Sequence, residues 1–373
     1  MQQNTSTQEA LTTKKHFKIL DGLRGLAAIA VVVFHFMEFV EPDYNDNFIA
    51  HSYLAVDFFF CLSGFVIAYA YDSRIATIGF TKFIKLRLIR LHPLVMIGAI
   101  IGLISFVIDP FSDLFAQYGS TETLLMFLSS ALMIPYAVVD ERYFNIFHLN
   151  PPTWSLFWEY IANIAYALFL FRLRKNLLWI ATLIAAVILF YASHDAGYLA
   201  IGWGGENFWG GAARILFSFL AGMLIYRTRF IIPNRIGFFG LSLLLLAAFV
   251  FPFIEEYNWL IDPLLVVVYF PLIVALGAGS TLDKSLEKVC DLSGRISYPL
   301  YMIHYPFLWL YLSMLEKNVI PEQYINASVW IGVLDLVVLS YIVMRFIDEP
   351  IRKKLKTRMK QKAARKEAAR SMA

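Results

Sequence analysis

The chain has 373 residues, of which 59% are hydrophobic and only 16% are charged, and its formal net charge is +4. An ordinary soluble protein carries about 25% charged residues. Together with a mean hydropathy of +0.62, this composition excludes a single soluble core and indicates a multi-pass membrane protein. Two cysteines, Cys61 and Cys290, are too few for a disulfide framework, and their spacing indicates no metal site.

Apolar segments of near-membrane-spanning length follow one another along the chain. A helix needs about 20 apolar residues to cross the hydrocarbon core of a bilayer. We therefore expect an all-α polytopic protein of about ten transmembrane helices, at residues 20–40, 53–71, 88–108, 153–171, 177–192, 211–226, 236–253, 259–278, 296–315 and 327–346. The first run is long and no small-residue cleavage site clearly follows it, so we expect no cleaved signal peptide.

The basic residues indicate which loops face the cytoplasm. With ten spans and both termini inside, all Lys and Arg residues except Arg142, Arg214 and Lys317 fall on the inner side, and the outer loops are acidic. This distribution follows the positive-inside rule. If a further apolar run, 123–138, spanned the membrane, the loops that follow it would lie on the opposite side from the one that the basic residues indicate. We interpret it as a re-entrant or interfacial helix in a long outer loop.

These features divide the chain into three parts. Residues 1–19 form a cytoplasmic N-terminal segment, 20–350 a transmembrane domain, and 351–373 a basic cytoplasmic tail. The tail is expected to be helical and to act as a topology anchor, with attraction to anionic lipid as the alternative. We expect the bilayer as a partner and no nucleic acid.

Two ionisable residues occur in the first predicted span. Arg24 and His35 are separated by ten residues in LDGLRGLAAIAVVVFHF, which corresponds to about 16 Å along a helix. Ionisable groups are expensive to insert into a bilayer, so each marks a candidate functional site. The spacing favours a cation near one surface, where it can hold an anionic ligand, and an imidazole deeper in the membrane for proton chemistry.

Two acids are expected at the depth of His35. Asp57 lies in the outer part of the second predicted span and Glu159 in the outer part of the fourth. A carboxylate beside a histidine fixes its tautomer and stabilises the imidazolium. We therefore predict that these three residues act together. The alternative is that each is a satisfied structural polar group between helices.

Basic residues are expected to cluster at the inner face. Arg87 and Arg90 lie three residues apart on one helical face, and Arg24 begins the first span. Guanidinium groups bind phosphates through bidentate hydrogen bonds. We predict an anion site at these arginines, with ordinary positive-inside charge as the alternative. His304 lies in a proline-interrupted span and is a candidate cavity-lining residue.

The same segments resemble the motifs of the integral membrane acyltransferase-3 family. Arg24 and His35 match its first-span pattern of an Arg and a His separated by ten residues. The other matching segments are AVDFFFCLSGFVIAYA with Asp57 and Ser63, KLRLIRLHP with Arg87 and Arg90, PPTWSLFWEY with Trp154, Ser155 and Glu159, and SGRISYPLYMIHYP with Tyr301 and His304. DEPIRK resembles the closing Glu-x-Pro element without its middle residue. Tyr160 stands where the family often has a second acid.

The resemblance implies transfer of an acyl group, usually acetyl, from cytoplasmic acyl-CoA to a hydroxyl of an extracytoplasmic carbohydrate or glycolipid, such as a polysaccharide or lipopolysaccharide. It implies a multi-pass enzyme of the bacterial inner membrane that uses acyl-CoA as co-substrate, with no permanently bound cofactor and no metal. In this scheme His35 is the general base, Asp57 or Glu159 orients it, and Arg24, Arg87 and Arg90 hold CoA. The candidate cavity-lining residues are Ser63, Trp154, Ser155, Tyr301 and His304, of which Ser155 and Tyr301 are candidate oxyanion donors.

Two other classes of protein remain open at this point. Intramembrane His, Asp and Glu residues can form a proton relay, and proline-interrupted spans are typical of transporters. A proton-coupled transporter or flippase of a lipid-linked saccharide is therefore the alternative function, although the two halves of the chain show no internal repeat. A non-catalytic scaffold of a polysaccharide export complex is the third hypothesis.

Overall fold

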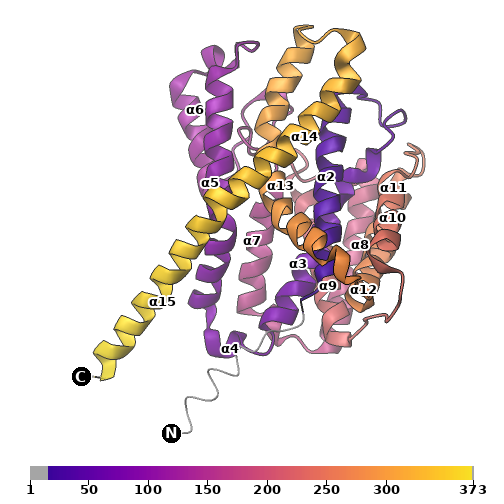
Figure 1. Ribbon diagram of the computed structural model, residues 1–373. Helices are drawn as coiled ribbons and strands as arrows, with labels where there is room; N and C mark the ends of the chain where they lie inside the picture. The colour runs from indigo at the N-terminus through magenta and orange to yellow at the C-terminus, as the bar shows by residue number, and fades with distance from the viewer. Residues whose placement is uncertain (1–15, 372–373) are drawn as a thin grey trace.

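The computed structural model describes residues 16–371, and this part of the chain is a bundle of helices with no β-strand (Figure 1). The longer helices are, in chain order, α2 (Lys18–Val40), α3 (Ala55–Tyr71), α5 (Phe80–Ile108), α6 (Leu114–Leu132), α7 (Thr153–Leu168), α8 (Lys175–Ala196), α9 (Phe208–Thr228), α10 (Gly237–Phe249), α12 (Phe270–Gly279), α13 (Glu287–Glu316), α14 (Ile325–Val343) and α15 (Glu349–Ser371). Short elements join them, notably η1 (Ala50–Leu54), α4 (Ile75–Ile78) and α11 (Asn258–Leu264).

The helices confirm a multi-pass membrane protein. Within residues 16–371, 7 helical stretches are long and apolar enough to cross a membrane. Helices α7, α10 and α13 occupy the other three predicted spans, and α10 is short, with 13 residues. The count of ten crossings and the cytoplasmic position of the termini remain predictions. Residues 1–15 of the predicted N-terminal segment lie outside the described residues.

Helix α2 lies against α13 through small residues. A Cβ atom on Gly25 would overlap Ser293, and one on Gly294 would lie 2.5 Å from Cβ of Asp21. Small residues at such positions let two helix backbones approach closely. This contact holds Arg24 and His35, which both lie on α2, against the polar residues of α13.

Helices α3 and α9 approach one another in the same way. A Cβ atom on Gly64 would overlap the carbonyl oxygen of Phe219, and one on Gly222 would overlap that of Cys61. The close crossing places Asp57 of α3 beside Arg214 of α9, and both side chains are buried.

The bounds of the helix predicted at 123–138 were wrong. Helix α6 covers Leu114–Leu132, and the following residue, Met133, has a left-handed conformation with φ 58° that ends it. Residues 133–139 are not helical, and α6 lies beside α5 (Figure 1). At the other end of the chain, α15 leaves the bundle as a long basic helix, which confirms that the tail is helical over the described residues.

Candidate active site

Three cavities lie in series through the bundle. They are named here by the orientation that the sequence predicts. The inner pocket has a volume of about 140 Å³ and is lined by Arg24, Arg90, Arg295 and Arg352 among others. The middle pocket, also about 140 Å³, shares Arg24, Arg90 and Tyr298 with it. The outer cavity is larger, about 720 Å³, and shares Val56 and Tyr301 with the middle pocket. Neighbouring cavities therefore lie against one another from the arginines to the cavity that holds His35.

His35 lines the outer cavity and is paired with an acid that sequence reasoning missed. Its Nδ1 atom lies 2.9 Å from Oε1 of Glu38, one turn further along α2. The hydroxyl of Tyr305 donates to the same oxygen at 3.2 Å. A carboxylate can only accept, so in the neutral imidazole Nδ1 carries the proton and Nε2 has the lone pair. The spacing His-x-x-Glu on a helix is the signal that could have identified Glu38, because residues three apart share a face.

His304 lies directly behind His35. The two rings stack with centroids 5.4 Å apart and an interplanar angle of 24°. The Nδ1 atom of His304 lies 2.9 Å from the carbonyl oxygen of Tyr301, so this nitrogen is the donor. Because His304 is fully buried and lines none of the three cavities, its expected place in a cavity wall was wrong. Its contact with the outer cavity runs through the His35 ring.

Asp57 does not serve as the partner of His35. Its carboxylate accepts from Arg214, with Oδ2 2.6 Å from Nη2 and 3.1 Å from Nε. Arg214 also donates to the backbone carbonyls of Ile201 and Tyr53. Removing one member of a buried ion pair leaves an uncompensated charge, so this pair is a structural unit. The prediction that Asp57 orients the base was wrong, because a buried arginine on another helix binds it more directly.

Glu159 belongs to the middle pocket. Its Oε1 atom accepts from Nη2 of Arg87 at 2.8 Å and from the hydroxyl of Ser63 at 2.9 Å. Contacts to these two residues place the acid among the basic groups, so its expected role beside His35 was also wrong. Glu159 instead holds one arginine of the predicted anion site in place.

The three predicted arginines come together, although they differ in their partners. Arg24 is tied to α13, where its Nε donates to the hydroxyl of Ser297 at 2.9 Å. Arg87 is bound to Glu159. In the described range, no hydrogen bond or ion pair holds the guanidinium of Arg90, which lines both the inner and the middle pocket. Arg90 is therefore the cation of the three that is available to an anionic group.

A pair of hydroxyls marks the boundary between the middle pocket and the outer cavity. The side-chain oxygens of Ser155 and Tyr301 lie 2.8 Å apart. Ser155 also donates to the carbonyl of Pro152 at 3.0 Å, so it accepts from Tyr301 at the same time. Of the other predicted lining residues, Ser63 lies in the middle pocket and Trp154 in the outer cavity.

A buried polar network supports the wall of the outer cavity. The hydroxyl of Tyr53 donates to Oδ2 of Asp262 at 2.7 Å, and the backbone N–H of Leu199 donates to the same atom. The side-chain amide of Asn258 donates to the hydroxyl of Tyr53, and the Nε2 atom of His51 lies 3.2 Å from Oδ1 of Asn258. These contacts fasten η1 and the loop after α8 to α11. The sequence pattern gave no signal for this network, because its residues come from three segments that are distant in sequence.

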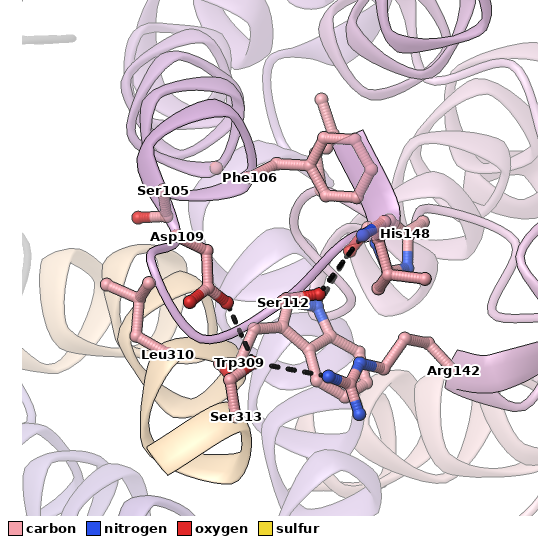
Figure 2. Close-up of a pocket in the computed structure, with 12 residues that line it drawn as sticks. Ser105, Phe106, Asp109, Ser112, Arg142, His148, Trp309, Leu310 and Ser313 are labelled. Atoms are coloured by element: carbon pink, nitrogen blue, oxygen red, sulfur yellow. Dashed lines mark hydrogen bonds between the residues drawn. The ribbon is translucent and has the colours of Figure 1, made fainter. Parts of the chain in front are cut away.

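A smaller pocket of about 20 Å³ lies behind Trp309, between α5, α13 and the loop after α6 (Figure 2). Ser313 donates to Asp109 at 2.7 Å and accepts from Arg142 at 3.2 Å. The indole N–H of Trp309 donates to the carbonyl of His148 at 2.8 Å. Since Trp309 lines the outer cavity, this pocket fixes one of the aromatic walls. Burial, together with the nearby charge of Arg142, lowers the pKa of His148 to about 3.

In residues 16–371, no group of three or more His, Cys, Asp or Glu residues lies together in a way that could hold a metal ion.

This multi-pass helical bundle places arginine-lined pockets next to a cavity that holds a histidine–glutamate pair. Residues 17–345 match the family model described as an acyltransferase domain, and the chain belongs to this acyltransferase-3 family. It is thus a membrane acyltransferase.

Two curated relatives illustrate the similarity. Protein 2 in picA locus of Rhizobium radiobacter is 33% identical over 190 residues, which cover 48% of this chain and 96% of the relative. O-acetyltransferase OatA of Staphylococcus aureus (strain NCTC 8325 / PS 47) is 25% identical over 372 residues, which cover 93% of this chain. The chain spans 59% of the length of OatA. No solved structure matches the chain.

Proposed function

We propose that this protein is an O-acyltransferase that moves an acyl group, with acetyl the first choice, from cytoplasmic acyl-CoA to a hydroxyl of a carbohydrate or glycolipid on the outer side of the bacterial inner membrane. The match to the acyltransferase family supports acyl transfer, and the similarity to OatA, which is named an O-acetyltransferase, supports acetyl as the group and a hydroxyl as the acceptor. The single observation that carries it is the series of three adjoining cavities between the arginines and the His35–Glu38 pair.

In this proposal the donor enters from the inner pocket. Phosphates of CoA bind the free guanidinium of Arg90, with Arg24 and Arg87 held beside it. Arg24 and His35 are separated by about 16 Å along α2, a distance that an extended pantetheine arm can span. The thioester then lies near Tyr301, where the middle pocket adjoins the outer cavity.

The acceptor hydroxyl binds in the outer cavity next to His35. Nε2 of His35 takes the hydroxyl proton as the oxygen attacks the thioester carbonyl, so a C–O bond forms. The tetrahedral intermediate collapses, the C–S bond breaks, and the imidazolium returns the proton to the CoA thiolate. Glu38 stabilises the imidazolium while it exists. General base catalysis contributes about 10²–10⁴-fold. Ser155 and Tyr301 are the candidate donors to the oxyanion, and in this proposal each hydroxyl turns to the ligand from its present acceptor, the Pro152 carbonyl for Ser155 and the Ser155 hydroxyl for Tyr301.

The test is transfer of label from radiolabelled acetyl-CoA to envelope glycans in inverted membrane vesicles. The native chain is compared with His35→Ala at matched abundance of folded protein. His194→Ala is the matched control, because His194 is an exposed histidine that lies on α8 and lines none of the three cavities.

We expect transfer in the native chain and the control, and its loss in His35→Ala. Equal transfer in all three variants would remove His35 as the base. Intact acetyl-CoA and no labelled glycan in any variant would contradict the proposed reaction and favour the transporter hypothesis, since a transporter leaves the thioester unbroken.

A further inference from the structure

The charged side chains that line the outer cavity are almost all acidic. Glu38 lies beside His35, and Asp43 and Glu255 lie in loops that form part of the wall. Asp43 and Glu255 are exposed. Hydrogen bonds from the backbone and side chain of Asn45 lower the pKa of Asp43, so this carboxylate stays ionised at neutral pH. A cavity lined by one sign of charge repels ligands of that sign.

Among the described residues that line the cavity, Arg214 is the one Lys or Arg, and its charge is already neutralised. Arg214 lines the outer cavity, but its guanidinium is bound to the Asp57 carboxylate and to two backbone carbonyls. Its side chain is 1% exposed. Arg142, the other nearby cation, is bound through two nitrogens to Glu316 and Ser313. Neither arginine is therefore available to pair with an anionic ligand.

Aromatic rings form much of the remaining wall and are held in place. Trp203 donates its indole N–H to the carbonyl of Ala200 at 2.7 Å, and Trp309 donates to the carbonyl of His148. Tyr44 and Tyr53 stack with centroids 5.9 Å apart. Sites for small ligands are typically lined by apolar and aromatic side chains, with a few polar groups that fix the orientation of the ligand. The amides of Asn45 and Asn145 also line the cavity and can bond hydroxyl groups.

From this charge and ring arrangement we propose that the outer cavity takes a saccharide that carries no negative charge. A sugar ring places its apolar face on the aromatic wall and its hydroxyls against amides and carboxylates, which accept hydrogen bonds from them. Asp43 and Glu255 disfavour saccharides that carry carboxylate, phosphate or sulfate groups. This inference rests on the proposed function, because it identifies the outer cavity as the acceptor site.

The test measures binding without any acyl donor, so it is independent of catalysis. The full chain is reconstituted into nanodiscs of zwitterionic lipid, and saturation-transfer NMR is recorded with chitotetraose as the neutral probe and tetragalacturonate as the anionic probe. Empty nanodiscs give the background. The double variant D43N/E255Q removes the two exposed charges, and Trp203→Leu removes part of the aromatic wall.

We expect chitotetraose to bind the native chain at least about fivefold more tightly than tetragalacturonate, the ratio that corresponds to one like-charge contact in water. D43N/E255Q should bring the two probes together by strengthening tetragalacturonate binding. Trp203→Leu should weaken chitotetraose binding. Equal or tighter binding of tetragalacturonate to the native chain, the same ratio in D43N/E255Q, or no binding of either probe would overturn the inference.

The two proposals fail in different ways. Binding of chitotetraose without label transfer in vesicles would leave the cavity assignment intact and contradict the reaction. Label transfer to glycans in a chain that prefers tetragalacturonate would support the reaction and overturn the acceptor class.

Discussion

The Nδ1 atom of His35 and the Oε1 atom of Glu38 lie 2.9 Å apart on one face of α2. This contact assigns the tautomer of the imidazole from within a single helix, whereas the acids of the neighbouring helices are bound to arginines. His35 and the acid paired with it are therefore local to α2, and in the proposed mechanism they act as the base and its orienting group.

Glu38→Gln should lower acyl transfer by about 10²-fold with little loss of folded protein, because an amide cannot stabilise the imidazolium that forms on His35. The measurement is kcat with acetyl-CoA in vesicles, together with its pH profile. Glu41→Gln, at the end of the same helix, is the matched control. Native activity in Glu38→Gln would remove Glu38 from the proton transfer.

Arg90→Ala should raise KM for acetyl-CoA by about 10-fold or more, because a charge-assisted hydrogen bond to a phosphate contributes roughly 1.5–3 kcal/mol. The effect on kcat should be smaller, since Arg90 lies in the inner and middle pockets and not beside His35. Lys82→Ala is the control, an exposed cation on the same helix. An unchanged KM in Arg90→Ala, or an equal rise in Lys82→Ala, would argue against a specific phosphate contact.

Asp57→Asn should destabilise the fold by about 3–5 kcal/mol, because it leaves Arg214 buried without a counter-charge. The double variant Asp57→Leu/Arg214→Met should recover much of this loss, since it removes both charges. Thermal unfolding in detergent measures the effect. A double variant no more stable than Asp57→Asn would show that the pair does more than balance charge.

The stability of the protein should fall as the pH is lowered from 7.5 to 5, and His148 should account for part of this fall. Its pKa is about 3 in the folded chain, whereas a solvated histidine titrates near 6.5. The unfolded state therefore binds the proton first, and the stability due to neutral His148 is lost as the pH falls below about 6.5. One pKa unit corresponds to 1.36 kcal/mol, so the contribution reaches about 2 kcal/mol at pH 5.

His148→Gln tests this pH dependence. The variant should lose less thermal stability than the native chain between pH 7.5 and 5, whereas His194→Gln, at an exposed position, should behave as the native chain does. An identical pH dependence in native and His148→Gln proteins would contradict the assignment.

The helical class, the order of the helices and the close approach of the basic residues could be read from the chain itself. Hydropathy determines which segments partition into a bilayer, and residues three or eleven apart on one helix, such as Arg87 with Arg90 or Arg24 with His35, have a relation set by helix geometry alone. The predicted bounds of α10 and α6 agreed less well with the structure, because helix ends depend on local turns such as the one at Met133, which has a left-handed conformation.

The tertiary structure alone decided which charges pair. The topology predicted from the sequence placed Asp57, Glu159 and His35 at a similar depth in the membrane. Depth does not determine the direction in which a side chain points around its helix axis. Rotation of α3 against α9, set by the glycine contacts of Gly64 and Gly222, turned Asp57 toward Arg214. The hydropathy of the chain does not predict that rotation, because the rotation arises from side-chain packing between helices that are distant in sequence.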